Sequence, residues 1–250
     1  MKQVSINTYK DIFSKKGFFV EKNFFDKFTI KKILREIQSG KGMVKYYDKK
    51  NNIRRIEKVY NKGLYLKNSN NKIQFFLKKI FKKKFTIFKD KYNAKPPKGE
   101  GFYAHYDGIF FFPDKNNRLR KGWYEYSNSF INVLIALDSC NKKNGALEIA
   151  KKHSGGFNKL IKNTYNDGTP NITKKIEKKC KFELINLNIG DIVIFQNTCP
   201  HRSNKNNSNK PRRTLYYTYT NAKKGSQYSK YFIDKKNSKN KTNKSLEGKI

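Results

Sequence analysis

The sequence contains no apolar stretch long enough to cross a membrane. Its longest candidates are Ile109–Phe112, Val133–Leu137 and Ile192–Phe195, all far shorter than the ~18 residues that a spanning helix needs. The N-terminal segment also lacks the apolar stretch of a secretory signal. We therefore expect a soluble cytoplasmic protein with no membrane partner.

Cysteine is scarce as well. Cys140, Cys180 and Cys199 are odd in number and far apart, which is typical of reduced thiols and not of a disulfide framework. None of them has a second cysteine at the short spacing of a structural zinc site. No glycine-rich phosphate-binding loop of either common type is present.

Acidic residues are few, with 19 against 57 basic residues and a formal charge of +38. Of the basic residues 49 are lysine and 8 are arginine, and the lysines are scattered through every segment. A protein that recognises nucleic acid would be expected to use more arginine, whose planar fork suits phosphates and guanine edges. Asn, Ile, Phe and Tyr share A/T-rich codons with Lys, so we interpret the charge as compositional bias. It predicts non-specific attraction to polyanions and no specific nucleic-acid binding.

The chain divides into a helical first part and a strand-rich second part. Apolar residues at three- and four-residue steps predict amphipathic helices over 26–38 and 70–83. Short β-prone segments alternate with turns in the second part. The predicted strands cover 17–20, 101–106, 130–137, 146–150, 184–187, 192–195 and 214–220. The pattern predicts an α+β protein whose larger part is an antiparallel barrel or sandwich.

We expect one domain over residues 1–234, with a helical part over about 1–95 and a strand-rich core over about 96–221. Residues 155–181 form an insertion with a short helix. The turn Asn188-Ile189-Gly190-Asp191 predicts a hairpin between the two strands that flank it. The Lys-, Asn- and Ser-rich tail, 235–250, is expected to be mobile.

The strand ending in His105-Tyr106-Asp107 carries a candidate metal site. Residues two apart in an extended chain point to the same face, so His105 and Asp107 can reach one ion. His201, which follows a strand and the turn at Pro200, is the natural third ligand. Two histidines and one carboxylate on one face of an ion leave positions open, as in non-haem Fe(II) oxygenases.

Arg212 adds a second indication. It opens the last predicted strand, eleven residues after His201, with Thr214 on the same face. A guanidinium buried beside the metal would need an anion. The distal carboxylate of 2-oxoglutarate would supply it through paired hydrogen bonds, and Thr214 could add a hydroxyl donor.

In order along the chain, these motifs resemble the phytanoyl-CoA dioxygenase-like family of Fe(II)/2-oxoglutarate-dependent oxygenases. The resemblance runs from about Gly17 to Thr220. It comprises Gly17-Phe18-Phe19-Val20, His105-Tyr106-Asp107, Leu134 to Asp138, Asn144-Gly145-Ala146-Leu147, Gly190 to Phe195, His201-Arg202-Ser203, Asn206 to Ser208 and Arg212-Arg213. It implies a double-stranded β-helix (jelly-roll, cupin-like) core with flanking N-terminal helices, and Fe(II), 2-oxoglutarate and O2.

The resemblance also bears on individual residues. The family places 2-oxoglutarate contacts on the face that carries Asn132, although a polar residue on the outer face is an equal alternative. Related halogenases lack the carboxylate ligand, so Asp107 favours hydroxylation. The stretch from Ala150 to Gly156 departs from the family pattern by lacking proline, and His153 there either approaches substrate or is solvated. Arg213 should point away from Arg212 and pair at the surface.

These patterns together predict a dioxygenase that hydroxylates an aliphatic C–H of a small molecule and releases succinate and CO2. A nucleic-acid demethylase of the same superfamily and a non-enzymatic basic nucleic-acid-binding protein are the alternatives. The substrate pocket should be lined by 118–126 and by the 155–181 insertion. Arg118, Arg120 and Lys121 hint at an acidic substrate group.

Overall fold

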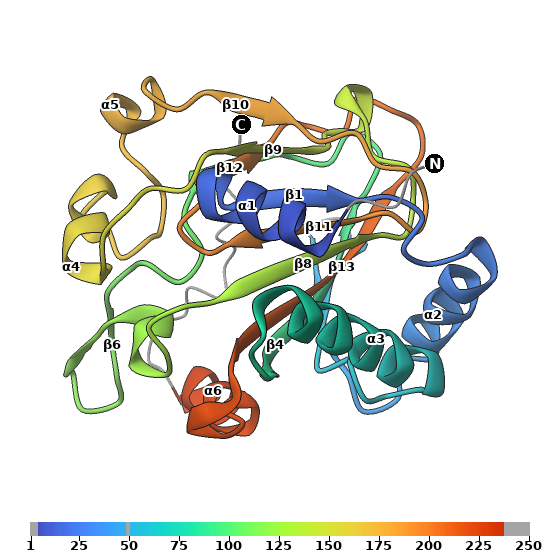
Figure 1. Cartoon of the computed structure of the whole chain (residues 1–250), viewed down its shortest axis with the longest axis horizontal. Coiled ribbons are helices and arrows are strands. Elements are labelled where there is room, and N and C mark those ends of the chain that lie inside the picture. Colours follow the sequence, from blue (N-terminus) through green and yellow to red (C-terminus); the bar gives the residue numbers. More distant parts are fainter. Residues whose placement is uncertain (1–4, 49–50, 238–250) are drawn as a thin grey trace.

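Two antiparallel sheets form the centre of the protein (Figure 1). The computed structural model describes residues 5–48 and 51–237. The seven-stranded major sheet has the order β1-β11-β8-β13-β4-β3-β2, and the four-stranded minor sheet has the order β10-β9-β12-β5. The major strands are β1 Phe18–Glu21, β2 Val44–Tyr47, β3 Ile53–Glu57, β4 Phe85–Lys95, β8 Ile131–Ala136, β11 Ile192–Gln196 and β13 Arg212–Asn221. The minor strands are β5 Phe102–His105, β9 Leu147–Ala150, β10 Phe182–Leu184 and β12 His201–Ser203.

Helices and short connections surround the sheets. The α-helices are α1 Ile6–Lys16, α2 Lys27–Ser39, α3 Leu64–Phe81, α4 Phe157–Leu160, α5 Lys174–Glu177 and α6 Tyr228–Asn237. The 3-10 turns are Gly122–Glu125, Lys142–Asn144, Ile161–Asn163 and Ala222–Lys224, and a two-stranded hairpin joins β6 Phe112–Pro113 to β7 Leu119–Arg120. None of the helices in the described ranges is long and apolar enough to span a bilayer.

One face of the major sheet is apolar, and the other carries both apolar and polar side chains. Its outer face packs on α1, α2 and α3, where Ile33, Leu77, Val133 and Tyr217 are fully buried in one cluster (Figure 1). Its inner face meets the minor sheet through a second, smaller apolar cluster. Because side chains alternate along a strand, every second residue of β4, β8 and β13 points between the sheets, where the polar residues of the site gather.

The helix boundaries follow from capping. Asp26 caps α2 by accepting from the backbone N–H of Thr29 at 2.7 Å, so the predicted helix at 26–38 is confirmed. The predicted helix at 70–83 begins earlier, at Leu64. The reason is tertiary: Glu36 of α2 accepts hydrogen bonds from the first backbone N–H groups of α3, at 3.0 Å from Tyr65 and 2.9 Å from Leu66.

The predicted boundary at about residue 95, between a helical part and a strand-rich core, does not match the observed strands. The part over 1–95 contains β2, β3 and β4 in addition to its helices, and β4 pairs with β13 along nearly its whole length. The segment Phe85–Lys95 carries three lysines among its β-formers, which hides its alternation. The α1 helix, capped by Ser5, was also not predicted.

The hairpin predicted across Asn188–Asp191 is wrong. The turn exists, with Gly190 at a φ of +89°, but β10 pairs with β9 whereas β11 pairs with β8 and β1. The turn therefore carries the chain from the minor to the major sheet. Its position is fixed by the carbonyl of Gly190, which accepts from Phe25 N–H at 2.9 Å.

The start of the predicted mobile tail is ordered. Residues 235–237 end α6, and Lys235 forms an ion pair with the buried Glu57 at 2.6 Å. The remainder of the tail, 238–250, lies outside the described residues. Helix α6 packs on β4 through Tyr231, whose ring lies 4.7 Å from that of Phe88.

Asp191 should be the most sensitive position of the sheet-crossing turn. Its fully buried carboxylate accepts from the N–H groups of Asn23 and Asn188, both at 2.8 Å, and pairs with Lys22 at 2.9 Å. Asp191→Ala should lower the free energy of unfolding by about 2–4 kcal/mol, because these donors lose their acceptor. Urea denaturation measures the change. The exposed Asp11→Ala on α1 is the control and should change it by less than ~0.5 kcal/mol; equal effects would contradict this assignment.

Candidate active site

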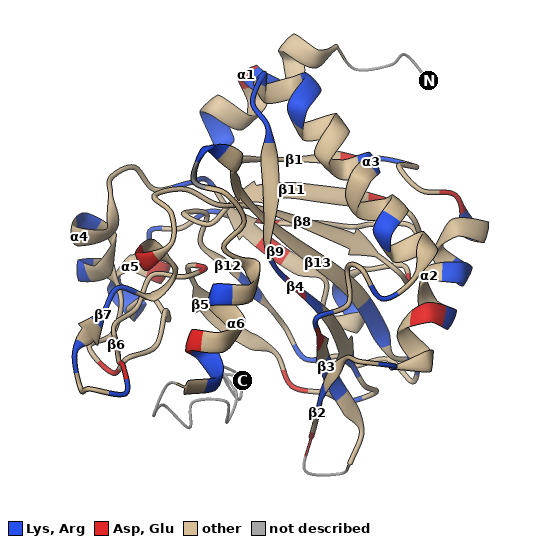
Figure 2. Ribbon diagram, turned by 90° about the horizontal axis from the view of Figure 1, so that it is seen from below, with Lys and Arg blue, Asp and Glu red and all other residues tan. Residues whose placement is uncertain are grey.

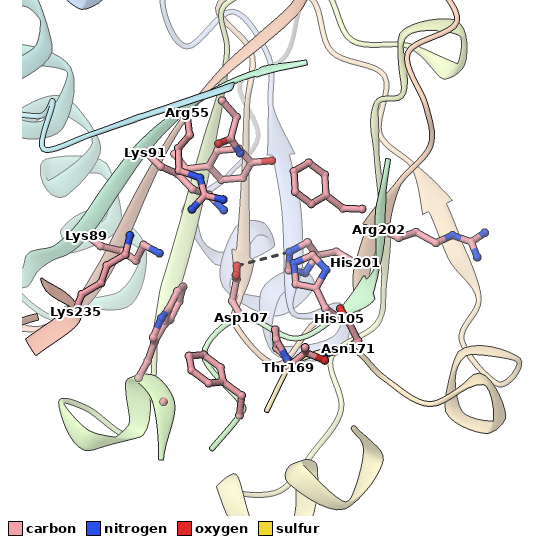
Figure 3. Close-up of a pocket in the computed structure, with 18 of the residues that line it drawn as sticks. Arg55, Lys89, Lys91, His105, Asp107, Thr169, Asn171, His201, Arg202 and Lys235 are labelled. Atoms are coloured by element: carbon pink, nitrogen blue, oxygen red, sulfur yellow. Dashed lines mark hydrogen bonds and ion pairs between the residues drawn. The ribbon is translucent and has the colours of Figure 1, made fainter. Parts of the chain in front are cut away.

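His105, Asp107 and His201 converge on one point between the sheets. His105 ends β5 and His201 begins β12, and the two residues are paired directly across these antiparallel strands. Their ring centroids lie 4.2 Å apart, and His201 Nε2 lies 3.6 Å from Asp107 Oδ2. The ligand atoms of all three side chains lie within 4.8 Å of one another, as the metal prediction requires. Figure 3 shows them at one side of a cavity.

Both imidazoles are oriented by backbone carbonyls. His105 Nδ1 lies 2.7 Å from the carbonyl oxygen of Tyr103, and His201 Nδ1 lies 3.0 Å from that of Cys199. A carbonyl oxygen only accepts, so each Nδ1 carries the proton and donates. Each Nε2 is then an unprotonated lone pair aimed at the shared point, which is the form in which histidine binds metal ions.

The carboxylate of Asp107 is held from behind. Asn132 Nδ2 donates to Asp107 Oδ2 at 2.9 Å, and Thr218 Oγ1 donates to Asn132 Oδ1 at 2.8 Å. The backbone of Asp107 is fixed by Asn197, which donates from its side chain to the Asp107 carbonyl and accepts from the Asp107 N–H, both at 3.1 Å. Asn132 therefore faces the site, but both ends of its amide contact protein groups. Its position indicates that it orients Asp107.

Burial keeps the two histidines neutral. It lowers the pKa of His105 to about 3, with the neighbouring His201 adding to the effect and Asp107 opposing it. Burial likewise lowers the pKa of His201, against the influence of Asp107. For Asp107, burial alone would raise the pKa, but its interactions with the His201 ring and with the charge of Lys91 outweigh burial and the net shift is downward. The site thus presents two neutral nitrogens and one carboxylate, a suitable donor set for a divalent transition metal.

Arg212 and Thr214 offer a buried cradle for an anion. They lie on the inner face of β13, with exposures of 4% and 0%. Within the described ranges, Arg212 Nε and Thr214 Oγ1 are buried and have no hydrogen-bond partner. Leaving such groups unpaired is costly, so they fit a ligand that brings its own oxygen acceptors. A carboxylate such as the distal end of 2-oxoglutarate meets that requirement.

The triad and Arg212 open onto one cavity of about 260 Å³. Trp123 and Tyr126 line it from the segment over 118–126, and Thr169 and Asn171 line it from the 155–181 insertion, so both predicted lining segments are confirmed. Arg118, Arg120 and Lys121 do not line the cavity, and Arg120 pairs with Glu125 at 2.8 Å, so these three residues are not the ones that would meet an acidic substrate group. The cations that do line it are Arg55, Lys89, Lys91, Arg202, Arg212 and Lys235.

Two other predicted side chains lie away from the cavity. His153 is hydrogen-bonded to the Tyr106 hydroxyl and lies 3.8 Å from Cys180 Sγ. It does not line the cavity and so does not approach substrate there. Arg213 points outward and forms a paired contact with Asp138, at 2.7 and 2.8 Å, which confirms its predicted surface role.

Removing the support of Asp107 should weaken metal binding. Asn132→Ala leaves all three ligands in place but frees the carboxylate to rotate, and loss of such a partner typically costs about 10–100-fold in metal affinity. Anaerobic equilibrium dialysis with Fe(II) measures it. Asn186→Ala, at an exposed asparagine, should bind iron as the wild type does. Wild-type affinity in Asn132→Ala would show that the hydrogen bond does not orient the ligand.

Acid should destabilise the metal-free protein through its histidines. A histidine in the unfolded chain has a pKa of about 6.5, so on acidification the unfolded state takes up protons that folded His105, with its pKa of about 3, does not. The free energy of unfolding should fall as pH decreases from about 6.5 towards 3, by at most ~1.4 kcal/mol per pH unit for each histidine. Urea denaturation between about pH 7.5 and 5 measures the slope, which His105→Asn should reduce. An unchanged slope in the variant would contradict the shift.

Comparison with known proteins agrees with this geometry. The family model of phytanoyl-CoA dioxygenase (PhyH) matches residues 13–214. The chain is 30% identical over 166 residues to a 2-aminoethylphosphonate dioxygenase of an uncultured bacterium, covering 66% of this chain and 56% of that protein. It is 30% identical over 153 residues to a methylphosphonate hydroxylase of Gimesia maris, covering 61% and 52%. The chain thus spans about half the length of these curated relatives.

Solved structures with the same architecture share little sequence. The epimerase SnoN, in complex with Fe3+, alpha ketoglutarate and nogalamycin RO, superposes with a TM-score of 0.64 at 12% identity, covering 87% of this chain and 84% of that one. EctD from S. alaskensis with bound Fe superposes with a TM-score of 0.67 at 15% identity, covering 88% and 78%. These likenesses confirm the predicted double-stranded β-helix core with flanking helices. The chain belongs to the phytanoyl-CoA dioxygenase (PhyH) family.

Proposed function

We propose that this protein is an Fe(II)- and 2-oxoglutarate-dependent dioxygenase of the cytoplasm that hydroxylates an aliphatic C–H of a small-molecule metabolite. One observation carries the proposal. Two unprotonated imidazole nitrogens and one carboxylate meet beside a buried arginine whose Nε has no partner among the described residues. The first group fits a ferrous ion and the second fits the far carboxylate of the keto acid.

Each residue then has a definite task. His105, Asp107 and His201 would hold the metal, and Arg212 with Thr214 would hold the distal carboxylate of 2-oxoglutarate. When bound, iron and 2-oxoglutarate would supply the oxidising chemistry, with O2 consumed, succinate and CO2 released, and one oxygen atom placed on the substrate. The chain itself contributes binding, orientation and exclusion of water. Because Asp107 occupies the carboxylate position, hydroxylation is favoured over halogenation.

The cavity favours a small substrate. Its volume of about 260 Å³ lies just below the ~300–1,000 Å³ typical of ligand pockets. Aromatic rings of Trp123 and Tyr126 form one wall and would exclude water. Two bacterial relatives are named for phosphonates, so phosphonates are the first compounds to screen.

The positive charge gives little support to the nucleic-acid alternatives. Lysine and arginine are spread over helices, strands and loops and do not gather on one element (Figure 2). A specific nucleic-acid reader is expected to concentrate them on one face. We therefore propose no specific nucleic-acid partner, and a methylated oligonucleotide in the substrate screen tests this directly.

Loss of a metal ligand should abolish turnover. His105→Ala removes one imidazole, so the iron- and 2-oxoglutarate-dependent formation of succinate should fall to the metal-free background, with or without substrate. The matched control is His153→Ala, which alters the chain's histidine outside the cavity and should keep wild-type succinate formation. Full turnover in His105→Ala would refute the metal assignment.

Two neighbouring arginines allow a strict test of the keto-acid site. Arg212→Gln should raise the KM for 2-oxoglutarate by about 100-fold or more, because charge-assisted hydrogen bonds contribute ~1.5–3 kcal/mol each. Arg213→Gln makes the same chemical change on the opposite face, where the side chain pairs with Asp138, and should leave that KM within about twofold of the wild type. Steady-state succinate assays distinguish the two, and equal effects would contradict the assignment.

A further inference from the structure

The wall of the cavity opposite the two imidazoles is cationic. Arg55, Lys89, Lys91 and Lys235 line it, and Figure 3 shows them on one side with the histidines on the other. The two carboxylates that act most strongly on the charges of Lys89 and Lys91 are Glu57 and Asp107. Glu57 is occupied by Lys235 at 2.6 Å, with Arg55 at 3.7 Å, and Asp107 is assigned to the metal. The wall therefore keeps an excess of positive charge.

Lys89 and Lys91 are the unusual members of this group. Within residues 5–48 and 51–237, neither ammonium forms a hydrogen bond or ion pair. Lys89 is 8% exposed, with its Nζ 4.7 Å from the ring centroid of Trp123, and the Nζ of Lys91 lies 4.8 Å from that of Tyr216. Burial lowers the pKa of both lysines; that of Lys91 falls to about 8, so this ammonium is still mostly charged at neutral pH. Asp90, between them, points to the other face of β4 and accepts from the backbone of Val59 and Tyr60.

Strand register separates this wall from the keto-acid cradle. Across the β4–β13 pair, Arg212 lies opposite Lys95, whereas Lys91 lies opposite Tyr216 and Lys89 opposite Thr218. Tyr216 follows Arg212 by four residues, which is about 13 Å of extended chain at ~3.3 Å per residue. A single molecule of 2-oxoglutarate held by Arg212 and chelating the metal would bring no anion to Lys89 or Lys91, and Asp107 would be engaged by the metal.

The same register places the wall close to the metal. Thr218 lies opposite Lys89 on one side and opposite Asn132 on the other, and Asn132 donates to Asp107. The backbones of Lys89 and Asn132 are thus separated by two inter-strand spacings, or about 10 Å at ~4.8 Å each. An anion held at the wall would be separated from the reacting carbon by only a few bonds.

We infer that Arg55, Lys89 and Lys91 form the substrate subsite and hold a terminal phosphoryl dianion, –PO3, of a small organic phosphonate or phosphate ester. This inference rests on the proposed function, since it names the substrate class of the same cavity. A phosphoryl group offers three oxygens and up to two negative charges, which matches several cations arriving from two strands. A carboxylate, planar and singly charged, would be satisfied by one arginine fork and leave the lysines unpaired.

Anaerobic calorimetry on the enzyme loaded with Fe(II) and 2-oxoglutarate tests the subsite with four probes of similar length. Propylphosphonate, propyl phosphate or both should bind, and comparing them separates the two sources of the phosphoryl group. Butyrate should bind at least about tenfold more weakly, and butanol should not bind measurably. Equal affinity for butyrate, or no binding of either phosphoryl compound, would overturn the inference.

Substitutions identify the residues responsible. Lys89→Met and Lys91→Met should each weaken binding of the preferred phosphoryl probe by about tenfold or more, while Lys31→Met, at an exposed position on α2, should leave it unchanged. Both cavity variants should melt no lower than the wild type, because each removes an ammonium that is partly or fully buried and forms no hydrogen bond or ion pair within the described residues. Wild-type affinity for the phosphoryl probe in both variants would contradict the assignment of Lys89 and Lys91 to the subsite.

Binding of Fe(II) and of 2-oxoglutarate to the enzyme is measured first in the same samples. If iron or 2-oxoglutarate fails to bind while a phosphoryl probe still does, the proposed function fails and the subsite stands. If Fe(II) and 2-oxoglutarate both bind normally and neither phosphoryl probe binds, the subsite fails and the proposed function stands.

Discussion

The direct pairing of His105 with His201 across β5 and β12 is the constraint on which the site depends. Two imidazoles on adjacent antiparallel strands can reach one ion only if they share a face and a register. Carbonyl oxygens of the second residue before each histidine then fix the rings, so that both Nε2 atoms point the same way. Asp107, two residues beyond the end of β5 at His105, completes the set because Asn197 holds its backbone.

The inner face of the major sheet extends this arrangement into a binding surface. Along β13, alternate side chains carry Arg212 and Thr214 at one end and Thr218 towards the other, and the row through Thr218 joins Asn132 to Lys89. An apolar side chain at any of these positions would stabilise the fold without the free-energy cost of burying a polar group. The burial of Arg212, Thr214 and Lys89 without full pairing among the described residues is therefore better explained by the ligands that they would hold than by the packing of the sheets.

Local patterns allowed much of this to be predicted. His105, Asp107 and Arg212 could be recognised because strand alternation and chain order alone bring them to one face. The start of α3 could not be recognised, because the group that caps it, Glu36, belongs to another helix. Lys89 was missed for a different reason: one functional lysine cannot be distinguished among 49 until burial and the lack of a partner are known.

X-ray absorption spectroscopy of the anaerobic protein loaded with one equivalent of Fe(II) tests the central claim most directly. The account predicts one ferrous ion per chain, with scattering from two imidazole rings and first-shell nitrogen and oxygen neighbours at about 2.0–2.2 Å. It also predicts that the imidazole scattering decreases when either His105 or His201 is replaced. An ion bound without imidazole, or no stoichiometric binding at all, would contradict it.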